Sequence, residues 1–428
     1  MSIIKVDSAG RDDSPSLLIE LQPAPTQTVN IPDGGLQAWL SVLGGVLVVA
    51  STFGYSNSFG VFQDYYVLSG SSSASNISWI GSVQLFFTFA MGLPAGKLFD
   101  LGSFHYTSIG GSLLYVFSLF MLSLADPSKY YQLILSQGIG MGIGAGLLLV
   151  PAVSVQAHHW KKWRSLAMGT VVTGSGFGGV FYPIMLNRLI HGHVGFAWGV
   201  RITGFLTLGL LVAANCIMRT RLPNARQRAP GLKPDVKAIM SDWPYILLLI
   251  AGFLGLWGLF YPYFYLQLWV NLHGLSPNLA FYTIAILNAS SIPGRIILNL
   301  LADRFGPLNV LPLVLLTTGS LIFVMFGATN VAGVIIFSIL YGFFSGASTA
   351  LYPPTAGRFA KGEHEIGLRL GVMYFACSFG ILTGTPIVGA LYDSDHEWYK
   401  PTVFSAVVLI AGGVLVLRTR HLVLNVRR

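Results

Sequence analysis

The chain has 428 residues, of which 53% are hydrophobic and only 10% are charged. Ordinary globular domains carry about 25% charged residues, so this composition excludes a water-soluble globular protein. The apolar residues come in blocks of about twenty, the length with which a helix crosses a hydrocarbon core about 30 Å thick. Composition and block length therefore predict an all-α membrane protein with many transmembrane helices.

Residues 1–37 mix Asp, Ser, Pro and Gln without sustained periodicity, and we interpret them as a disordered cytoplasmic tail. No basic stretch followed by a short apolar stretch precedes the first long apolar block, so a cleavable signal peptide is not expected. The first span should then serve as an uncleaved membrane anchor.

Twelve transmembrane spans are expected after this tail. They lie near 38–63, 77–99, 104–125, 130–153, 165–189, 196–218, 243–269, 278–302, 310–328, 332–353, 367–391 and 401–417. The longest polar interruption separates the sixth span from the seventh. The predicted organisation is an N-terminal six-helix half (38–218), a central cytoplasmic loop (219–242), a C-terminal six-helix half (243–417) and a short basic cytoplasmic tail (418–428).

The distribution of Lys and Arg predicts the orientation, because cytoplasmic loops carry an excess of these residues. Of the 25 Lys and Arg residues, 20 fall on the side that carries both termini, four fall on the opposite side, and Arg295 lies within a span. Both termini are therefore predicted to be cytoplasmic. The net charge of +9 would suggest a nucleic-acid partner in a soluble protein, but here it follows from topology, and no nucleic acid is expected.

A short motif occurs twice, six spans apart. GKLFDLG (residues 96–102) follows the second span, and NLLADRFG (residues 299–306) follows the eighth. Each copy places an Asp at a helix end and a Gly just beyond it. An Asp–Arg pair beside a permissive Gly can hold two helices together in one conformation and release them in another. Asp100, Asp303 and Arg304 are therefore candidate gating residues, with a tight helical turn as the structural alternative.

These turns resemble the Gly-x-x-x-Asp-Arg-x-Gly loop motif of the major facilitator superfamily, with Asn299 at the first position of the second copy. Residues 32–39 (PDGGLQAW) and 159–169 (HWKKWRSLAMG) are similar to the segments that lead into the first and fifth spans of the monocarboxylate-porter family, in particular its fungal branch. The resemblance covers the chain from residue 32 onward. It implies a twelve-helix transporter that moves a small organic solute by alternating access.

One charge lies well inside a span. Arg295 belongs to a series with Asn288, Ser291 and Asn299 at spacings of three or four residues, so these side chains share one helix face. A charge in mid-span is costly unless it is partnered, and its guanidinium could bind a carboxylate bidentately. This face is the predicted solute site. An arginine bound to helix-end carbonyls for structure alone is the alternative.

The resemblance adds roles to this site. Arg295 matches the family's substrate-binding arginine, whereas Asn57 stands where the family has a lysine and Ser291 where it has an acidic residue. Both departures remove groups that would manage a proton and an anion. A larger, partly aromatic or neutral solute, such as a vitamin, an acid or a secondary metabolite, is therefore favoured over simple monocarboxylates. Proton coupling stays open but loses support.

Three further residues complete the predicted site. Phe344 and Ser348 match a phenylalanine and a serine of the family's tenth span. Tyr261 belongs to an aromatic cluster around Pro262, and a helix break at this proline could turn aromatic faces toward a cavity.

Other classes of protein fit less well. The sequence shows neither metal-ligand spacing nor a nucleophile beside a His, so neither an enzyme nor a cofactor is expected. Cys216 and Cys377 fall inside spans as small apolar fillers, and His158 and His159 are expected to face water or lipid headgroups. A transporter-like nutrient sensor without flux is the alternative function.

The triplet Asn76-Ile77-Ser78 is an acceptor pattern for N-glycosylation on the predicted outer side, which makes Asn76 a candidate modification site. The plasma membrane is the expected location, with an internal membrane as the alternative. Neither the solute nor the direction of transport follows from the sequence.

Overall fold

The computed structural model describes residues 33–426, with gaps at 71, 73, 222–235 and 394–397. Every regular element in these ranges is helical. The first half comprises α1 (Leu36–Val49), η1 (Ala50–Gly54), α2 (Phe59–Leu68), α3 (Ala74–Ala90), α4 (Gly92–Asp100), α5 (Phe104–Leu124), α6 (Tyr130–Leu133), η2 (Ile134–Met141), α7 (Gly142–Ser154), η3 (Val155–His158), α8 (Arg164–Val172), α9 (Gly174–Ile190) and α10 (Gly195–Ile217).

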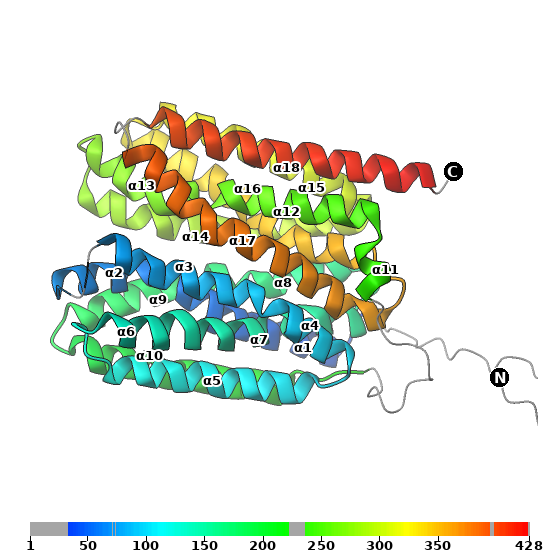
Figure 1. Cartoon of the computed structure of the whole chain (residues 1–428), viewed down its shortest axis with the longest axis horizontal. Coiled ribbons are helices and arrows are strands. Elements are labelled where there is room, and N and C mark those ends of the chain that lie inside the picture. The colour runs from blue at the N-terminus through cyan, green and yellow to red at the C-terminus, as the bar shows by residue number, and fades with distance from the viewer. Residues whose placement is uncertain (1–32, 71, 73, 222–235, 394–397, 427–428) are drawn as a thin grey trace, which may run out of the picture. The chain divides into compact units, whose positions relative to one another are not determined.

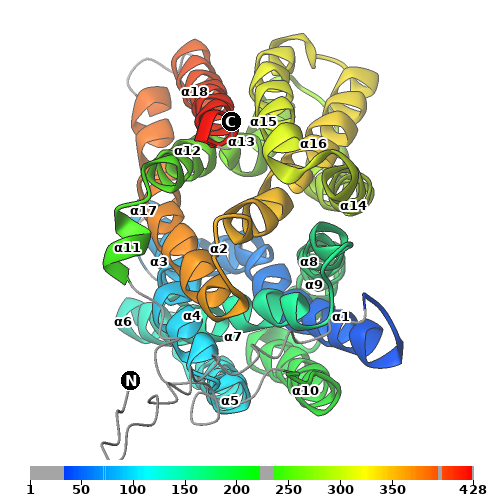
Figure 2. The ribbon, with the colours of Figure 1, turned by 90° about the vertical axis from the view of Figure 1, so that its right-hand side faces the viewer.

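The second half has the same kind of architecture. It comprises α11 (Val236–Met240), α12 (Trp243–Leu259), α13 (Tyr261–Leu272), α14 (Pro277–Phe305), α15 (Pro307–Val324), η5 (Met325–Gly327), α16 (Val331–Gly357), η6 (Glu363–Glu365), α17 (Ile366–Asp393) and α18 (Tyr399–Val426). The long helices run side by side (Figure 1), and the two halves meet where α3 and α4 contact α17 and where α8 and α9 contact α14 (Figure 2).

Eleven helices of the described residues are long and apolar enough to cross a membrane. Of the twelve expected spans, the fifth is not among these eleven helices. It is divided at Thr173 into α8 and α9, and α9 alone has only 17 residues. The two helices follow each other directly and together cover one membrane thickness. Glycines at 174, 176 and 178 lower the helix propensity beside this break.

Several other spans are interrupted too, and two of these interruptions lie at residues of the predicted site. The first span passes from α1 through the π-helical turn η1 and restarts at Phe59, which leaves Asn57 in the turn between η1 and α2. The seventh span ends as α12 at Leu259 and restarts as α13 at Tyr261. Pro262 lies in the first turn of α13, where its missing N–H costs no hydrogen bond. The predicted break at this proline is confirmed.

The last helix is longer than expected. The predicted basic tail begins at residue 418, but α18 continues to Val426. Its final turns keep an apolar pattern, His421-Leu422-Val423-Leu424, between the basic residues, so the helix has no sequence signal to end at Leu417. Most of the predicted tail therefore continues the last helix. Of the segment 1–37 that was expected to be disordered, residues 1–32 lie outside the described residues, as does most of the central loop, whereas Leu36 and Gln37 already belong to α1 because the apolar block begins there.

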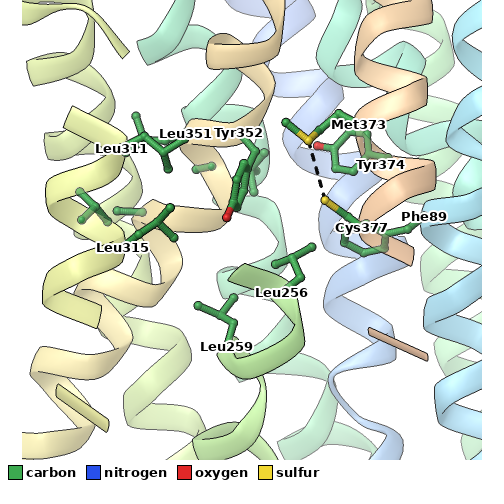
Figure 3. Close-up of a cluster of buried hydrophobic side chains, with 14 of the residues drawn as sticks. Phe89, Leu256, Leu259, Leu311, Leu315, Leu351, Tyr352, Met373, Tyr374 and Cys377 are labelled. Atoms are coloured by element: carbon green, nitrogen blue, oxygen red, sulfur yellow. Dashed lines mark hydrogen bonds between the residues drawn. The ribbon is translucent and has the colours of Figure 1, made fainter. Parts of the chain in front are cut away.

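A continuous apolar core fills the second half and extends into the first. Tyr352 and Cys377 lie in it beside Leu256, and the Cys377 thiol donates to the Met373 thioether at 3.9 Å (Figure 3). Cys377 is buried and Cys216 is exposed on the outer surface of α10, and both are free thiols. Both fall in apolar helices, as predicted.

The two sequence segments that resemble the monocarboxylate porters contact each other. The Asp33 carboxylate accepts hydrogen bonds from the backbone N–H groups of Lys161 and Lys162 at 2.5 and 2.6 Å. Trp39 packs edge-on against Trp160, with the ring centroids 5.0 Å apart. These contacts fix the loop that precedes α8.

The expectation that His158 and His159 face water or headgroups is wrong, because both are buried. His159 Nε2 lies 2.8 Å from the Arg219 carbonyl and 3.3 Å from the Ser41 hydroxyl. Burial lowers the pKa of the His159 imidazole. The ring therefore ties the end of α10 to α1, a contact between segments far apart in sequence that the local pattern does not reveal.

Candidate solute site and gate

The Asp100 carboxylate connects α4 of the first half to α17 of the second. Its Oδ1 accepts a hydrogen bond from the Gly367 N–H at 2.9 Å, and its Oδ2 accepts one from the Leu368 N–H at 2.6 Å. Both N–H groups belong to the first turn of α17, where intrahelical partners are lacking and the helix dipole favours a negative charge. A carboxylate of one half thus caps a helix of the other.

Glycines bring the backbones of α4 and α17 together at this point. A Cβ added to Gly96 would overlap the Gly367 carbonyl, and one added to Gly371 would overlap the carbonyl of Gly92. Such close backbone approach is possible only without side chains. We call these four glycines together with the Asp100 cap the α4–α17 contact.

Asp303 makes the equivalent connection on the other side of the molecule. Its two carboxylate oxygens accept from the Ser165 and Leu166 N–H groups, each at 2.7 Å, at the start of α8. Arg304 is exposed, and its guanidinium lies 6.0 Å from the Phe305 ring. The predicted Asp–Arg pairing is therefore wrong in its chemistry, because each Asp binds backbone N–H groups across the two halves.

Arg295 lies on α14 and reaches both halves. It is 4% exposed; its Nε donates to the Gly346 carbonyl of α16 at 3.3 Å, and its Nη1 donates to the Val172 carbonyl at 3.2 Å. Val172 is the last residue of α8, so the break in the fifth span frees this carbonyl, and the negative end of a helix dipole suits a cation. Within the described ranges no carboxylate forms an ion pair with Arg295.

Two amides lie beside this cation. Asn57 Nδ2 donates to the Ser175 carbonyl at 3.2 Å, and its distance to Asn288 Oδ1 is 3.5 Å. Asn288 Nδ2 is in turn 3.5 Å from the Gly179 carbonyl. The two 3.5 Å hydrogen bonds of Asn288, to Asn57 and to Gly179, cross between the halves and are weak. The structure thus brings Asn57, Asn288 and Arg295 together, as the sequence predicts.

A small cavity of about 20 Å³ lies among these groups. It is lined by Phe53, Asn57, Leu259, Phe260, Tyr263, Asn288, Arg295, Ser345 and Thr349. A water molecule needs roughly 10–15 Å³ on this measure, so the cavity has room for little more than one. The halves are closed around Arg295 in this conformation, and an organic solute could enter only after they move apart.

The other residues predicted for the site lie next to the cavity or away from it. Ser291 and Ser348 are fully buried and donate to backbone carbonyls of their own helices at 2.6 and 2.7 Å. Asn299 Nδ2 donates to the Arg295 carbonyl at 2.8 Å, and its side chain faces Gly169 of α8. Phe344 packs against the core, and the Tyr261 hydroxyl bonds Thr402 at 2.8 Å.

Sequence reasoning missed several residues that line the cavity. Ser345 and Thr349 each follow a predicted residue by one position, which is about a quarter of a helical turn. Of the predicted aromatic cluster around Pro262, which also includes Tyr263, it is Tyr263 and not Tyr261 that lines the cavity, and its hydroxyl lies 3.2 Å from that of Ser345. The break before α13 sets this register, and the signal for the break, Pro262, is present in the sequence.

The candidate glycosylation site lies at the far end of the molecule from the gate. Asn76 is exposed in the first turn of α3, and its amide donates to the Ser72 hydroxyl at 2.9 Å. Glycosylation of this residue stays a prediction.

Two helical halves that close on a polar cavity at interrupted helices have the architecture of a secondary transporter. The chain belongs to the Major Facilitator Superfamily, which it matches over residues 41–361 and 285–425. It is 42% identical to the aspyridones efflux protein apdF of Emericella nidulans, over 95% of this chain and 82% of that protein. It is 38% identical to the agnestins efflux protein AgnL12 of Paecilomyces divaricatus, over 90% of this chain and 87% of that protein. It is also 38% identical to the MFS-type transporter pynF of Aspergillus niger, over 91% of this chain and 89% of that protein.

Solved structures show the same fold. The transporter FucP in an outward conformation superposes with a TM-score of 0.69 at 16% identity, over 89% of this chain and 98% of that one. A bacterial homologue of the iron transporter ferroportin in an outward-facing state superposes with a TM-score of 0.71 at 14% identity, over 90% of this chain and 100% of that one. These structures confirm the predicted all-helical fold class, and the family match together with the relatives above confirms a transporter in place of an enzyme.

Proposed function

We propose that this protein exports a small organic secondary metabolite by alternating access, with Arg295 as the fixed cation of the solute site. The observation that carries the proposal is the pairing of Arg295 with two carbonyls and no carboxylate among the described residues. The two carbonyls accept from two of the five guanidinium N–H donors and leave the charge uncompensated. An acidic or strongly hydrogen-bond-accepting group on a solute would compensate it.

The walls of the cavity support a partly aromatic solute. Phe53, Phe260 and Tyr263 provide ring surfaces, while Asn57 and Asn288 provide amides that can donate or accept. Ligand sites commonly combine an apolar lining with a few such polar groups. This chemistry fits an aromatic organic acid or a related metabolite better than a small monocarboxylate. The printed names of the relatives likewise describe efflux proteins and MFS-type transporters and no monocarboxylate porter, so the proposal does not include the expected monocarboxylate-porter family.

The direction of transport and the topology are part of the same proposal. Export follows the printed names of the relatives from Emericella nidulans and Paecilomyces divaricatus. The excess of Lys and Arg supports cytoplasmic termini, and with them a gate on the cytoplasmic side. Export out of the cell would place the protein in the plasma membrane. Single cysteines at Lys129 and Lys361 should react with an impermeant maleimide from opposite faces of the membrane. Reaction from the same face would contradict this topology.

The proposal is tested with the full chain in proteoliposomes. Flux of radiolabelled benzenesulfonate, 4-octylbenzenesulfonate and uncharged aromatic amides is measured with and without protein, because sulfonates stay ionised and cross lipid slowly unaided. Protein-dependent, saturable flux of at least one probe is the expected result. Saturable binding without flux would favour the sensor, and absence of both would refute the solute site.

Arg295 is tested by two substitutions. Arg295→Lys keeps the charge but loses the planar fork, so binding of a sulfonate should weaken by roughly 1–3 kcal/mol. Arg295→Gln should be worse than Lys for a sulfonate and similar to Lys for an uncharged amide. The matched control is Arg201→Gln on α10, whose guanidinium contacts Trp198 and Ser123 away from the cavity. Unchanged affinity in both Arg295 variants would make this arginine structural.

A further inference from the structure

An apolar groove lies on the outer surface at the seam between α9 and α14. Its volume is about 450 Å³, and it is lined by Phe177, Val180, Phe181, Ile184, Met185, Ala289 and Ile292. Phe177 and Phe181 are each about half exposed. Because α14 is one of the candidate membrane spans and α9 belongs to the divided fifth span, the hydrocarbon of the bilayer would face this groove. Its volume falls in the range of roughly 300–1,000 Å³ typical of sites for small organic ligands.

The wall between this groove and the Arg295 cavity is thin. Ile292 lines the groove, whereas Asn288 and Arg295, one turn away on either side along α14, line the cavity. Gly176 of α9 lies between them: a Cβ built there would be 2.8 Å from Ile292 Cγ1 and 3.1 Å from Arg295 Nη1. One glycine and one isoleucine side chain therefore separate an apolar surface from a buried cation.

We propose that this groove is the entrance by which an amphipathic aromatic anion passes from the bilayer to Arg295. The apolar tail of the solute would lie along α9 and α14, and its anionic head would reach Arg295 past Gly176 and Ile292. The inference rests on the proposed function of the Arg295 site and adds a route and a solute class to it.

Two observations favour such a solute over a lipid acyl chain that merely covers the surface. A passive acyl chain would suit any lipid-facing surface, whereas this groove adjoins the buried cation. It also lies on the seam between the halves, so separation of α9 from α14 would widen the groove and the cavity in one movement.

The first test fills the groove. Ala289→Trp places an indole in it, and Ala213→Trp, an exposed alanine on α10, is the matched control. In proteoliposomes Ala289→Trp should slow 4-octylbenzenesulfonate flux by about tenfold, equal to about 1.4 kcal/mol of barrier, and leave benzenesulfonate flux within twofold. Equal flux in the two tryptophan variants, or equal slowing of both probes by Ala289→Trp, would overturn the entrance.

A second test does not depend on flux or on the tryptophan variant. 4-Octylbenzenesulfonate with a diazirine at the end of its tail is photolysed with the wild-type protein, and labelled peptides are mapped by mass spectrometry. Labelling of residues 177–185 or 289–292 that excess 4-octylbenzenesulfonate displaces and that Arg295→Gln abolishes supports the proposal. Labelling that persists in Arg295→Gln would identify an ordinary lipid-like contact and overturn it. If labelling depends on Arg295 but no probe is transported, the entrance stands and the export function fails.

Discussion

The two halves meet through two contacts that share an Asp carboxylate capping a helix but differ in what lies between the helix backbones. In the α4–α17 contact, the Asp100 carboxylate caps a helix while glycine backbones touch directly. In the α8–α14 contact, which we define by Asp303, Gly169 and Asn299, a carboxylate again caps a helix, but a polar side chain fills the space between the backbones. The first contact is rigid and the second is adjustable.

The difference assigns separate tasks to the two contacts. Backbone atoms, unlike side chains, cannot rotate out of the way, so the α4–α17 contact can open only if one whole helix moves away from the other. In the α8–α14 contact, Asn299 binds the Arg295 carbonyl, and Arg295 binds the end of α8. A solute that engages Arg295 would therefore act on the second contact directly and on the first only through movement of a whole half.

The largest effect is expected where backbones touch. In Gly96→Ala the new methyl group overlaps the Gly367 carbonyl, so the closed conformation should lose about 1–3 kcal/mol, as in overpacked cores. The rate at which an impermeant maleimide alkylates a cysteine at the cavity residue Thr349, with Cys216 and Cys377 replaced, should rise from the gate side. Gly110→Ala on α5, where a Cβ meets nothing within 4 Å, is the control. An unchanged rate would contradict a rigid contact.

A smaller effect is expected from the two caps. Asp100→Asn and Asp303→Asn replace one acceptor oxygen by an NH2 group that faces a helix N–H and keep the other oxygen, at a cost of roughly 0.5–2 kcal/mol for a weakened helix cap. Asp100 is 2% exposed and Asp303 only partly buried, so Asp100→Asn should open the gate more by the same alkylation assay. Both should slow transport with little change in solute affinity. Asp126→Asn in an exposed turn is the control, and normal turnover in both variants would reduce the caps to packing devices.

The smallest effect is expected at Gly169. A methyl group there would overlap Asn299 Nδ2, which can turn aside, and would lie 2.8 Å from Asn299 Cβ, which can only shift, so Gly169→Ala should cost less than Gly96→Ala, whose methyl group meets backbone atoms. Adding Asn299→Gly, which removes both the amide and the Cβ, should restore the wild-type alkylation rate. Failure of this rescue would show that the α8–α14 contact is as rigid as its counterpart.

Much of the fold could be predicted because its signals are local in sequence: long apolar blocks mark the spans, and Pro262 marks the break before α13. The site was predictable as far as it depends on a mid-span charge: Arg295, Asn288 and Asn57 do meet. Which side of a helix faces the cavity could not be predicted. A one-residue difference separates Ser348 from Thr349, and the helix break turns Tyr263 inward instead of Tyr261.

Contacts that join distant segments could not be predicted either, because they depend on how the helices pack. The Asp303 cap on α8 depends on the close approach of segments 137 and 138 residues apart. The local pattern around Asp303 suggested Arg304 as its partner instead. Only the packing of the halves makes free N–H groups available to the carboxylate.

The isolated charge of Arg295 has an electrical consequence. When the cavity faces one solution and then the other, the guanidinium experiences a different fraction of the membrane potential, which is worth about 2.3 kcal/mol per elementary charge across 100 mV. The empty protein would therefore turn over with a voltage-dependent charge movement, and a bound monoanion would cancel it. Transient currents on a solid-supported membrane should be largest without solute and should vanish in Arg295→Gln.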